Sequence, residues 1–141
     1  MDIPVIDASN YFRGLLLLIR RDRKVTQSEV DLMMRIGKAL GFEEEFCRQS
    51  IEGILENEHV REHPPKFSDR NLAMKFVRDG LILSCSDNEM HPLEEEWLKF
   101  VAELNGLDPQ WFLQEKRRAL TAAKLHPHLE IESFRVADLR K

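Results

Sequence analysis

Features that mark several common protein classes are scarce in this sequence of 141 residues. Its two cysteines, Cys47 and Cys85, are too few for a disulfide framework or a cysteine-based metal site, and they fit a reducing cytoplasm. The longest purely apolar run, Leu15 to Ile19, is far shorter than the roughly 20 residues that cross a bilayer. The N-terminal residues show no secretory signal pattern. We therefore expect a cytoplasmic protein without direct membrane insertion.

An excess of basic charge is also missing. The chain has 21 Lys and Arg against 25 Asp and Glu, which gives a formal net charge of −4. Proteins that bind the phosphate backbone show the opposite balance, so we expect no nucleic-acid partner. The two short basic clusters, at 20–24 and 116–118, lack interleaved aromatic residues and are typical of solvated helix ends. The acidic segments favour cations or basic partners instead.

Catalytic signatures are absent as well. The sequence holds no Ser, His and Asp order typical of hydrolases, no phosphate-binding loop and no dinucleotide-binding glycine motif. We therefore expect that the protein is not an enzyme. Alternating β-branched residues between turn signals are missing too, so the expected fold class is all-α.

What the sequence does contain is an internal duplication. A shift of 65 positions aligns the two halves without a gap, and apolar positions follow the same offset. The identical pairs include Asp22 with Asp87, Glu29 with Glu94 and Gly41 with Gly106. We interpret the pattern as one unit of helix, acidic loop, helix, turn and helix that occurs twice.

Apolar periodicity and capping signals predict three helices in each half. The expected ranges are about 10–21 with Ser9 as the cap, 27–40, 43–57, 70–84 capped by Ser68 or Asp69, 92–104, and 109–123. We expect one domain over 1–141, a compact helical bundle of two pseudo-repeated three-helix units (about 10–57 and 69–123). A short C-terminal helix or an ordered tail would lie on its core.

The second acidic loop is a candidate cation site. Asp87, Glu89 and Glu94 could each present carboxylate oxygens to calcium or another divalent cation. The loop is not an EF-hand, because the spacing is too short and the mid-loop glycine is absent. The alternative is that Glu94 caps the helix that begins near Pro92, while Asp87 forms an Asx turn.

The first acidic loop is a weaker candidate. Its carboxylates are Asp22 and Glu29, but Arg23 and Lys24 lie between them and oppose cation binding. Thr26 to Glu29 reads as a capping box, in which the hydroxyl and the carboxylate each pair with a backbone N–H at the helix start. We interpret this loop as structural.

Two histidines form a further candidate metal site. His59 and His63 are four residues apart, which on a helix would place both imidazoles on one face. Zinc needs a third ligand, and Pro64 and Pro65 oppose a regular helix there. His91 is better explained as a residue that begins a helix, and Trp97 and Trp111 as core residues.

Each half contains an apolar helix, the pattern Asp-x-x-apolar-x-x-x-Glu and an amphipathic helix that ends near a glycine. The repeated pattern resembles the TerB-like family of bacterial tellurite-resistance proteins and the related N-terminal domain of a membrane-anchored J-domain co-chaperone. The similarity covers roughly Tyr11 to Leu120. It implies a helical bundle with clustered acidic residues that acts as a metal-responsive or stress-response interaction module. This chain departs from the family in its first loop, which usually reads Asp-Gly.

The expected function is therefore a non-enzymatic interaction or sensing module in bacterial stress response. Its protein partner is not identified by the sequence, and its candidate cofactor is a divalent cation. Two other classes stay open. A structural scaffold, for example a homodimer, needs no ion. A metal-dependent hydrolase would need carboxylates from both halves around one metal, which Lys24 opposes.

Overall fold

A computed structural model describes residues 2–20, 26–56, 63–85, 90–122, 130–133 and 135–136. Helices dominate these residues: α1 (Val5–Ile19), α2 (Gln27–Ala39), α3 (Glu44–Glu56), α4 (Arg70–Ser84), α5 (Pro92–Leu104) and α6 (Pro109–Ala122). A 3-10 helix, η1 (Glu130–Ser133), and two strands of two residues each, β1 (Asp2–Ile3) and β2 (Arg135–Val136), complete the described elements. The expected all-α class is confirmed.

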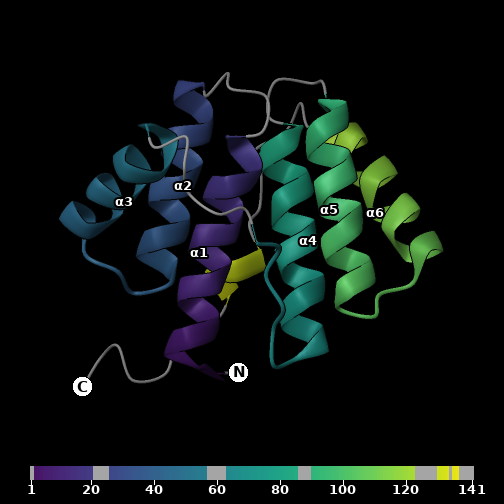
Figure 1. The fold of residues 1–141 in the computed structure, drawn as a ribbon, viewed down its shortest axis with the longest axis horizontal. Coiled ribbons are helices and arrows are strands. Elements are labelled where there is room, and N and C mark those ends of the chain that lie inside the picture. Colours follow the sequence, from purple (N-terminus) through teal and green to yellow (C-terminus); the bar gives the residue numbers. More distant parts are fainter. Residues whose placement is uncertain are drawn as a thin grey trace.

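Helices α1 and α4 form the centre of the molecule (Figure 1). Helices α2 and α3 pack on the α1 side, and α5 and α6 pack on the α4 side. Every residue from Leu15 to Ile19 is at most 1% exposed, which confirms the interior position that the apolar run of α1 predicts. The core extends from α1 through Phe76 and Val77 of α4 to Leu98 and Val101 of α5.

Helix limits follow the offset of 65 residues. Helices α4, α5 and α6 begin at Arg70, Pro92 and Pro109, each 65 positions after the start of α1, α2 and α3. The residues after α2 and α5 match as well, because Gly41 and Gly106 have φ angles of 86° and 72°. Glycine adopts this left-handed conformation without the Cβ penalty of other residues, and the turn ends both helices.

Local capping signals explain most helix starts. Thr26 caps α2, Asp69 accepts the Asn71 N–H of α4 at 2.7 Å, and Asp108 accepts the Gln110 N–H of α6 at 2.8 Å. The predicted start of α1 at Asn10 is wrong, because the helix begins at Val5 with Pro4 as its N-cap. The acidic Asp7 in the first turn favours the earlier start, and its carboxylate also accepts the hydroxyl of Ser68.

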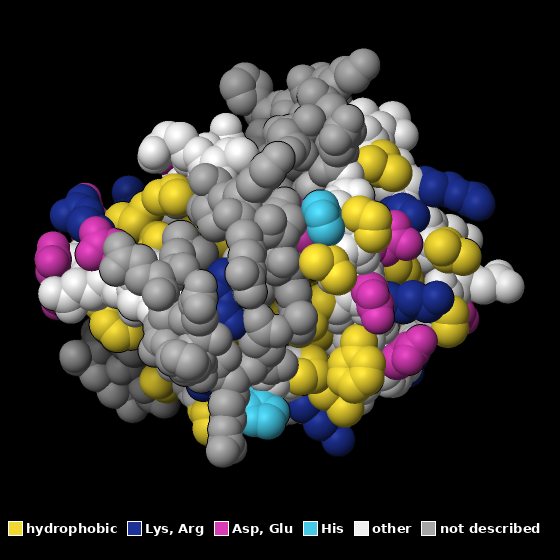
Figure 2. Space-filling view, turned by 45° about the horizontal axis from the view of Figure 1, so that its top comes forward, with side chains coloured by type: hydrophobic (Ala, Val, Ile, Leu, Met, Phe, Trp, Pro, Cys, Tyr) yellow, Lys and Arg dark blue, Asp and Glu magenta, His cyan; other side chains and the backbone are white. Residues whose placement is uncertain are grey.

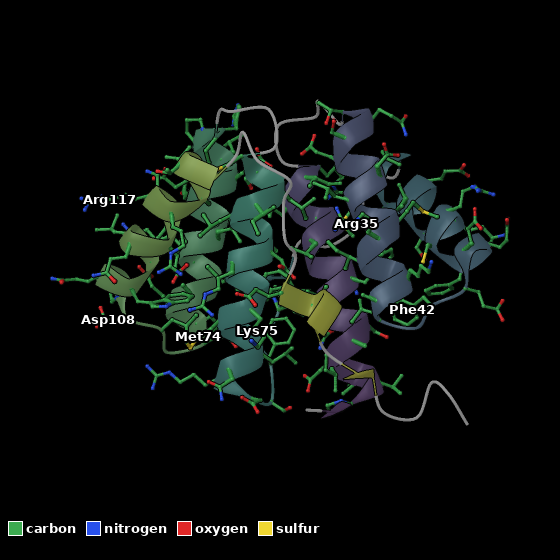
Figure 3. The ribbon with its side chains drawn as sticks, turned by 180° about the vertical axis from the view of Figure 1, so that it is seen from behind. Arg35, Phe42, Met74, Lys75, Asp108 and Arg117 are labelled. Atoms are coloured by element: carbon green, nitrogen blue, oxygen red, sulfur yellow. The ribbon has the colours of Figure 1, made fainter. Side chains whose placement is uncertain are left out.

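The C-terminal segment closes the core, as expected for an ordered tail. Ile131 of η1 is fully buried, and η1 contacts both α4 and α2. Figure 3 shows this segment between the two halves, near Lys75 on α4 and Arg35 on α2. Strand β2 then pairs in parallel with β1, with Ile3 opposite Val136. The sequence did not predict this pairing, because two residues are too few to show a strand pattern.

Among the described residues, no helix has both the length and the apolar character that a membrane crossing requires.

Candidate functional site

Four of the predicted site residues, Asp22, His59, Asp87 and Glu89, lie outside the described residues. The structure describes the other three, Glu29, His63 and Glu94. Among the described residues, no three His, Cys, Asp or Glu side chains lie close enough together to hold a metal ion. The cation and zinc sites therefore stay predictions.

Glu29 forms the predicted capping box at the start of α2. Its carboxylate accepts the backbone N–H of Thr26 at 3.0 Å, and the Thr26 hydroxyl accepts the Glu29 N–H at 3.1 Å. The side chain is buried. These contacts confirm the structural interpretation of Glu29, because they use its carboxylate to hold the helix start.

The start of α5 is built differently. His91 is the N-cap, its Nδ1 accepts the Leu93 N–H at 3.1 Å, and Pro92 occupies the first turn. This confirms the role of His91 and corrects the prediction that Glu94 is the cap. Glu94 lies in the same first turn, where a negative charge is stabilised by the helix dipole, and is only 2% exposed.

The described histidine of the zinc candidate lies at the surface. His63 is exposed and directly precedes Pro64 and Pro65. It is not in a helix, so the helical spacing that supported a pair with His59 does not apply on its side.

An open groove on the outer face of α5 is the main concave feature near these residues. It has a volume of about 600 Å³. Its lining residues are Pro64, Leu93, Glu96, Trp97, Lys99, Phe100 and Glu103. Figure 2 shows hydrophobic side chains interleaved with charged ones on the α5 and α6 side of the molecule. An apolar surface with a charged rim is typical of sites that bind another molecule.

Three large apolar side chains of α5 face solvent. Leu93, Phe100 and Leu104 are 47%, 54% and 41% exposed, and their spacing places them on one side of the helix. Trp97 lies on the same side but is buried, which confirms its assignment to the core. The prediction that Phe100 and Leu104 also belong to the core is wrong, because the core stripe of α5 is already filled by Trp97, Leu98 and Val101 and their neighbours.

Charges line one edge of this apolar stripe. Glu96 and Glu103 are seven residues apart, and Lys99 lies between them. None of the three forms an ion pair with another described residue, whereas the neighbouring Glu95 pairs with Lys116 of α6 at 2.5 Å. The rim of the groove therefore offers two carboxylates and one ammonium group to a binding partner.

The basic clusters do not form an open basic surface in the described residues. Arg20 donates to the carbonyl oxygen of Ile54 at 3.2 Å. In α6, Lys116 pairs with Glu95, and Arg118 lies 3.7 Å from the Glu115 carboxylate. These contacts agree with the interpretation of both clusters as helix ends and helix surfaces.

A buried carboxyl group that the sequence analysis missed fixes the C-terminal segment. Asp79 of α4 accepts the Tyr11 hydroxyl at 2.5 Å and the backbone N–H groups of Glu130 and Ile131 at 2.6 and 3.1 Å. Burial raises the pKa of Asp79 from 3.8 to about 7, although the hydrogen bonds act in the opposite direction. Burial and the adjacent carboxyl group also raise the pKa of Tyr11 well above 10.0.

Ion pairs reinforce the same junction. Arg78 lies 3.6 Å from the Glu130 carboxylate and 3.3 Å from that of Glu115, and its guanidinium lies over the ring of Trp111. The Asp79 carboxyl is fully enclosed beneath these contacts. A group that cannot reach a substrate is unsuited to catalysis, so this cluster is a structural clasp that joins α1, α4 and η1.

Comparison of the chain with protein-family models, with curated proteins and with solved structures gives no match.

Proposed function

We propose that this protein is a cytoplasmic, non-enzymatic interaction and sensing module of TerB-like type that acts in bacterial stress response. The observation that carries the proposal is the exposed apolar groove on α5. Burial of apolar surface contributes roughly 25 cal/mol per Å², so the exposed Phe100 and Leu93 side chains favour a bound partner. The resemblance of both acidic loops to the family pattern supports the assignment to stress response.

A divalent cation at the second loop is the proposed trigger. Asp87, Glu89 and Glu94 would supply the oxygen ligands, and calcium is the leading candidate. Glu94 and the groove residue Leu93 are consecutive in the first turn of α5. A cation bound by Glu94 and the preceding loop would therefore hold this turn in place and change the shape of one end of the groove.

Thermal melts of metal-stripped protein test the trigger. Calcium should raise the melting temperature of the native chain, since a ligand that binds only the folded state stabilises it. The variant Asp87→Ala should lose this shift. Asp22→Ala, the equivalent change in the first half, is the matched control and should retain it.

The other outcomes are equally informative. A shift with zinc alone, lost in His59→Ala, would move the metal site to His59 and His63. The absence of a shift with calcium, magnesium and zinc would contradict the cation trigger. Neither result bears on the groove, whose occupancy is measured separately.

A structural homodimer is the second candidate function, because an exposed apolar stripe can also bind a second copy of the chain. Light scattering distinguishes the two. A stable dimer that Phe100→Ala converts to a monomer would favour the scaffold, and a monomeric native chain would favour the interaction module.

A further inference from the structure

We propose that the groove on α5 binds an amphipathic helix whose apolar face is flanked by basic residues. This inference rests on the proposed interaction function and names the chemistry of the partner.

The shape of the apolar surface fits a helix. Leu93, Phe100 and Leu104 extend along about 16 Å of α5, at a rise of about 1.5 Å per residue. A second helix laid beside this stripe would present anchors at i, i+3 or i+4, and i+7. Ridges of one helix pack between those of the other, and the exposed Phe100 ring is the largest available anchor.

The charges of the rim select basic flanks. Glu96 and Glu103 are separated by two helical turns, so they lie on the same edge of the stripe. Basic residues seven apart on the partner would meet both carboxylates, as flanking charges do in paired helices. Lys99 is the one cation among the lining residues, so an acidic partner would face two repulsive contacts for each attractive one.

The fold itself does not require the apolar stripe. The offset of 65 residues places Ser28, Arg35 and Ala39 of α2 at the positions of Leu93, Phe100 and Leu104. Helix α2 has the same length as α5 and the same glycine turn at its end. Since a polar surface is compatible with this element in one half, the apolar surface in the other half calls for a binding partner.

A second copy of the chain fits the groove less well. A symmetric dimer pairs the same patch with itself, so in an antiparallel arrangement the Glu96 and Glu103 edges of both copies would face each other. Each copy also carries a net charge of −4. The same acidic rim opposes an anionic lipid surface, which attracts basic residues.

Fluorescence anisotropy with two labelled peptides tests the proposal on the full chain. Both peptides are helices of about 18 residues with the same leucine face, and they carry either lysine or glutamate beside it. The lysine peptide should bind at least about tenfold more tightly than the glutamate peptide. In the variant Trp111→Phe, Trp97 is the one remaining tryptophan, and its emission should change when the lysine peptide binds.

Variants locate the binding surface. Phe100→Ala should weaken lysine-peptide binding about tenfold or more, as expected for an aromatic anchor. Phe46→Ala is the matched control, because Phe46 on α3 is 51% exposed but lies outside the groove lining. The double change Glu96→Lys and Glu103→Lys should reverse the preference between the two peptides. Glu52→Lys, an exposed position on α3, should leave it unchanged.

Several results would overturn the inference. These are equal affinity for the two peptides, binding that is insensitive to both Phe100→Ala and the double charge change, or no binding of the lysine peptide to a folded chain. A dimer that occupies the groove, or binding to phosphatidylserine vesicles that Phe100→Ala abolishes, would assign the groove to another occupant. Lysine-peptide binding without a calcium-dependent melt would keep the inference and remove only the cation trigger.

Discussion

Helices α2 and α5 occupy equivalent places in the two halves but present different surfaces. Their core positions agree, since Leu32 and Trp97 are both buried. Their outer faces do not, because α2 has Arg35 where α5 has the exposed Phe100. The difference separates what the fold needs from what it does not. Buried positions are kept apolar by packing, whereas an exposed phenylalanine contributes little to folding and points to recognition.

The segments that follow the two halves are also attached in different ways. Pro65 follows the first half and packs closely against Gly14 of α1, where an added Cβ would lie 2.9 Å from the proline ring. Asp79 and Glu130 lie 65 positions further on, and there the contact is a hydrogen bond. Proline has no N–H to satisfy, so a glycine suffices beside it, whereas the N–H of Glu130 needs an acceptor when it is buried.

The largest effect is expected when the second attachment is removed. Asp79→Ala leaves the Tyr11 hydroxyl and two backbone N–H groups without their acceptor inside the protein. The free energy of unfolding should fall by about 3–5 kcal/mol. Urea unfolding followed by circular dichroism measures the loss, and a change below about 1 kcal/mol would show that the clasp is dispensable.

Gly14→Ala is the control in the first half. Its Cβ would meet the Phe76 ring at 2.8 Å and the Pro65 ring at 2.9 Å, and neither ring is a flexible chain end. Overpacking of this kind costs about 1–3 kcal/mol, and the higher helix propensity of alanine offsets up to about 1 kcal/mol. The net loss should therefore be smaller than that of Asp79→Ala.

The second attachment should also respond to pH. The folded-state pKa of Asp79 is raised from 3.8 to about 7, so the folded protein binds the proton more tightly than the unfolded chain does. This contribution to stability is complete below about pH 4 and is lost as the pH rises to about 7. The groups that face the carboxyl group are the Tyr11 hydroxyl of α1 and the Glu130 carboxylate of η1.

Unfolding free energies measured from pH 4 to 8 should show this loss as a difference between the native chain and Asp79→Asn. The expected size is on the order of a few kcal/mol. Parallel pH profiles for the two proteins would show that Asp79 keeps the same affinity for protons in both states.

The smallest effect on stability is expected when the surface of α2 is transferred to α5. The triple change Leu93→Ser, Phe100→Arg and Leu104→Ala should alter the free energy of unfolding by less than about 1 kcal/mol, because all three side chains are at least 41% exposed. Binding of the lysine peptide should nevertheless fall by at least about tenfold. A large loss of stability would mean that the apolar stripe belongs to the fold.

Local signals predicted the helices well, because each helix start depends on nearby residues. The capping box at Thr26, the cap at Asp108 and the proline at position 92 lie within a few residues of the backbone groups that they affect. The start of α1 was missed because Pro4, which has no capping side chain, precedes it.

Contacts distant in the sequence could not be predicted in this way. Asp79 looks like an ordinary charged helix residue until Glu130, 51 positions away, is placed beside it. The groove was missed for a different reason. Apolar periodicity marks Phe100 and Trp97 alike, and only the arrangement of the other helices decides which of them is covered. The acidic residues Asp87 and Glu89 remain predictions of the sequence alone.

The pairing of β1 with β2 has a consequence for the synthesis of the chain. Ile3 is among the first residues to leave the ribosome and is almost fully buried in the finished protein, yet its strand partner is Val136. The helices of the first half can form while translation continues, but this strand pair has to wait until the second half has been made. Completion of the core is therefore a late event, and it brings together segments that emerge at opposite ends of translation.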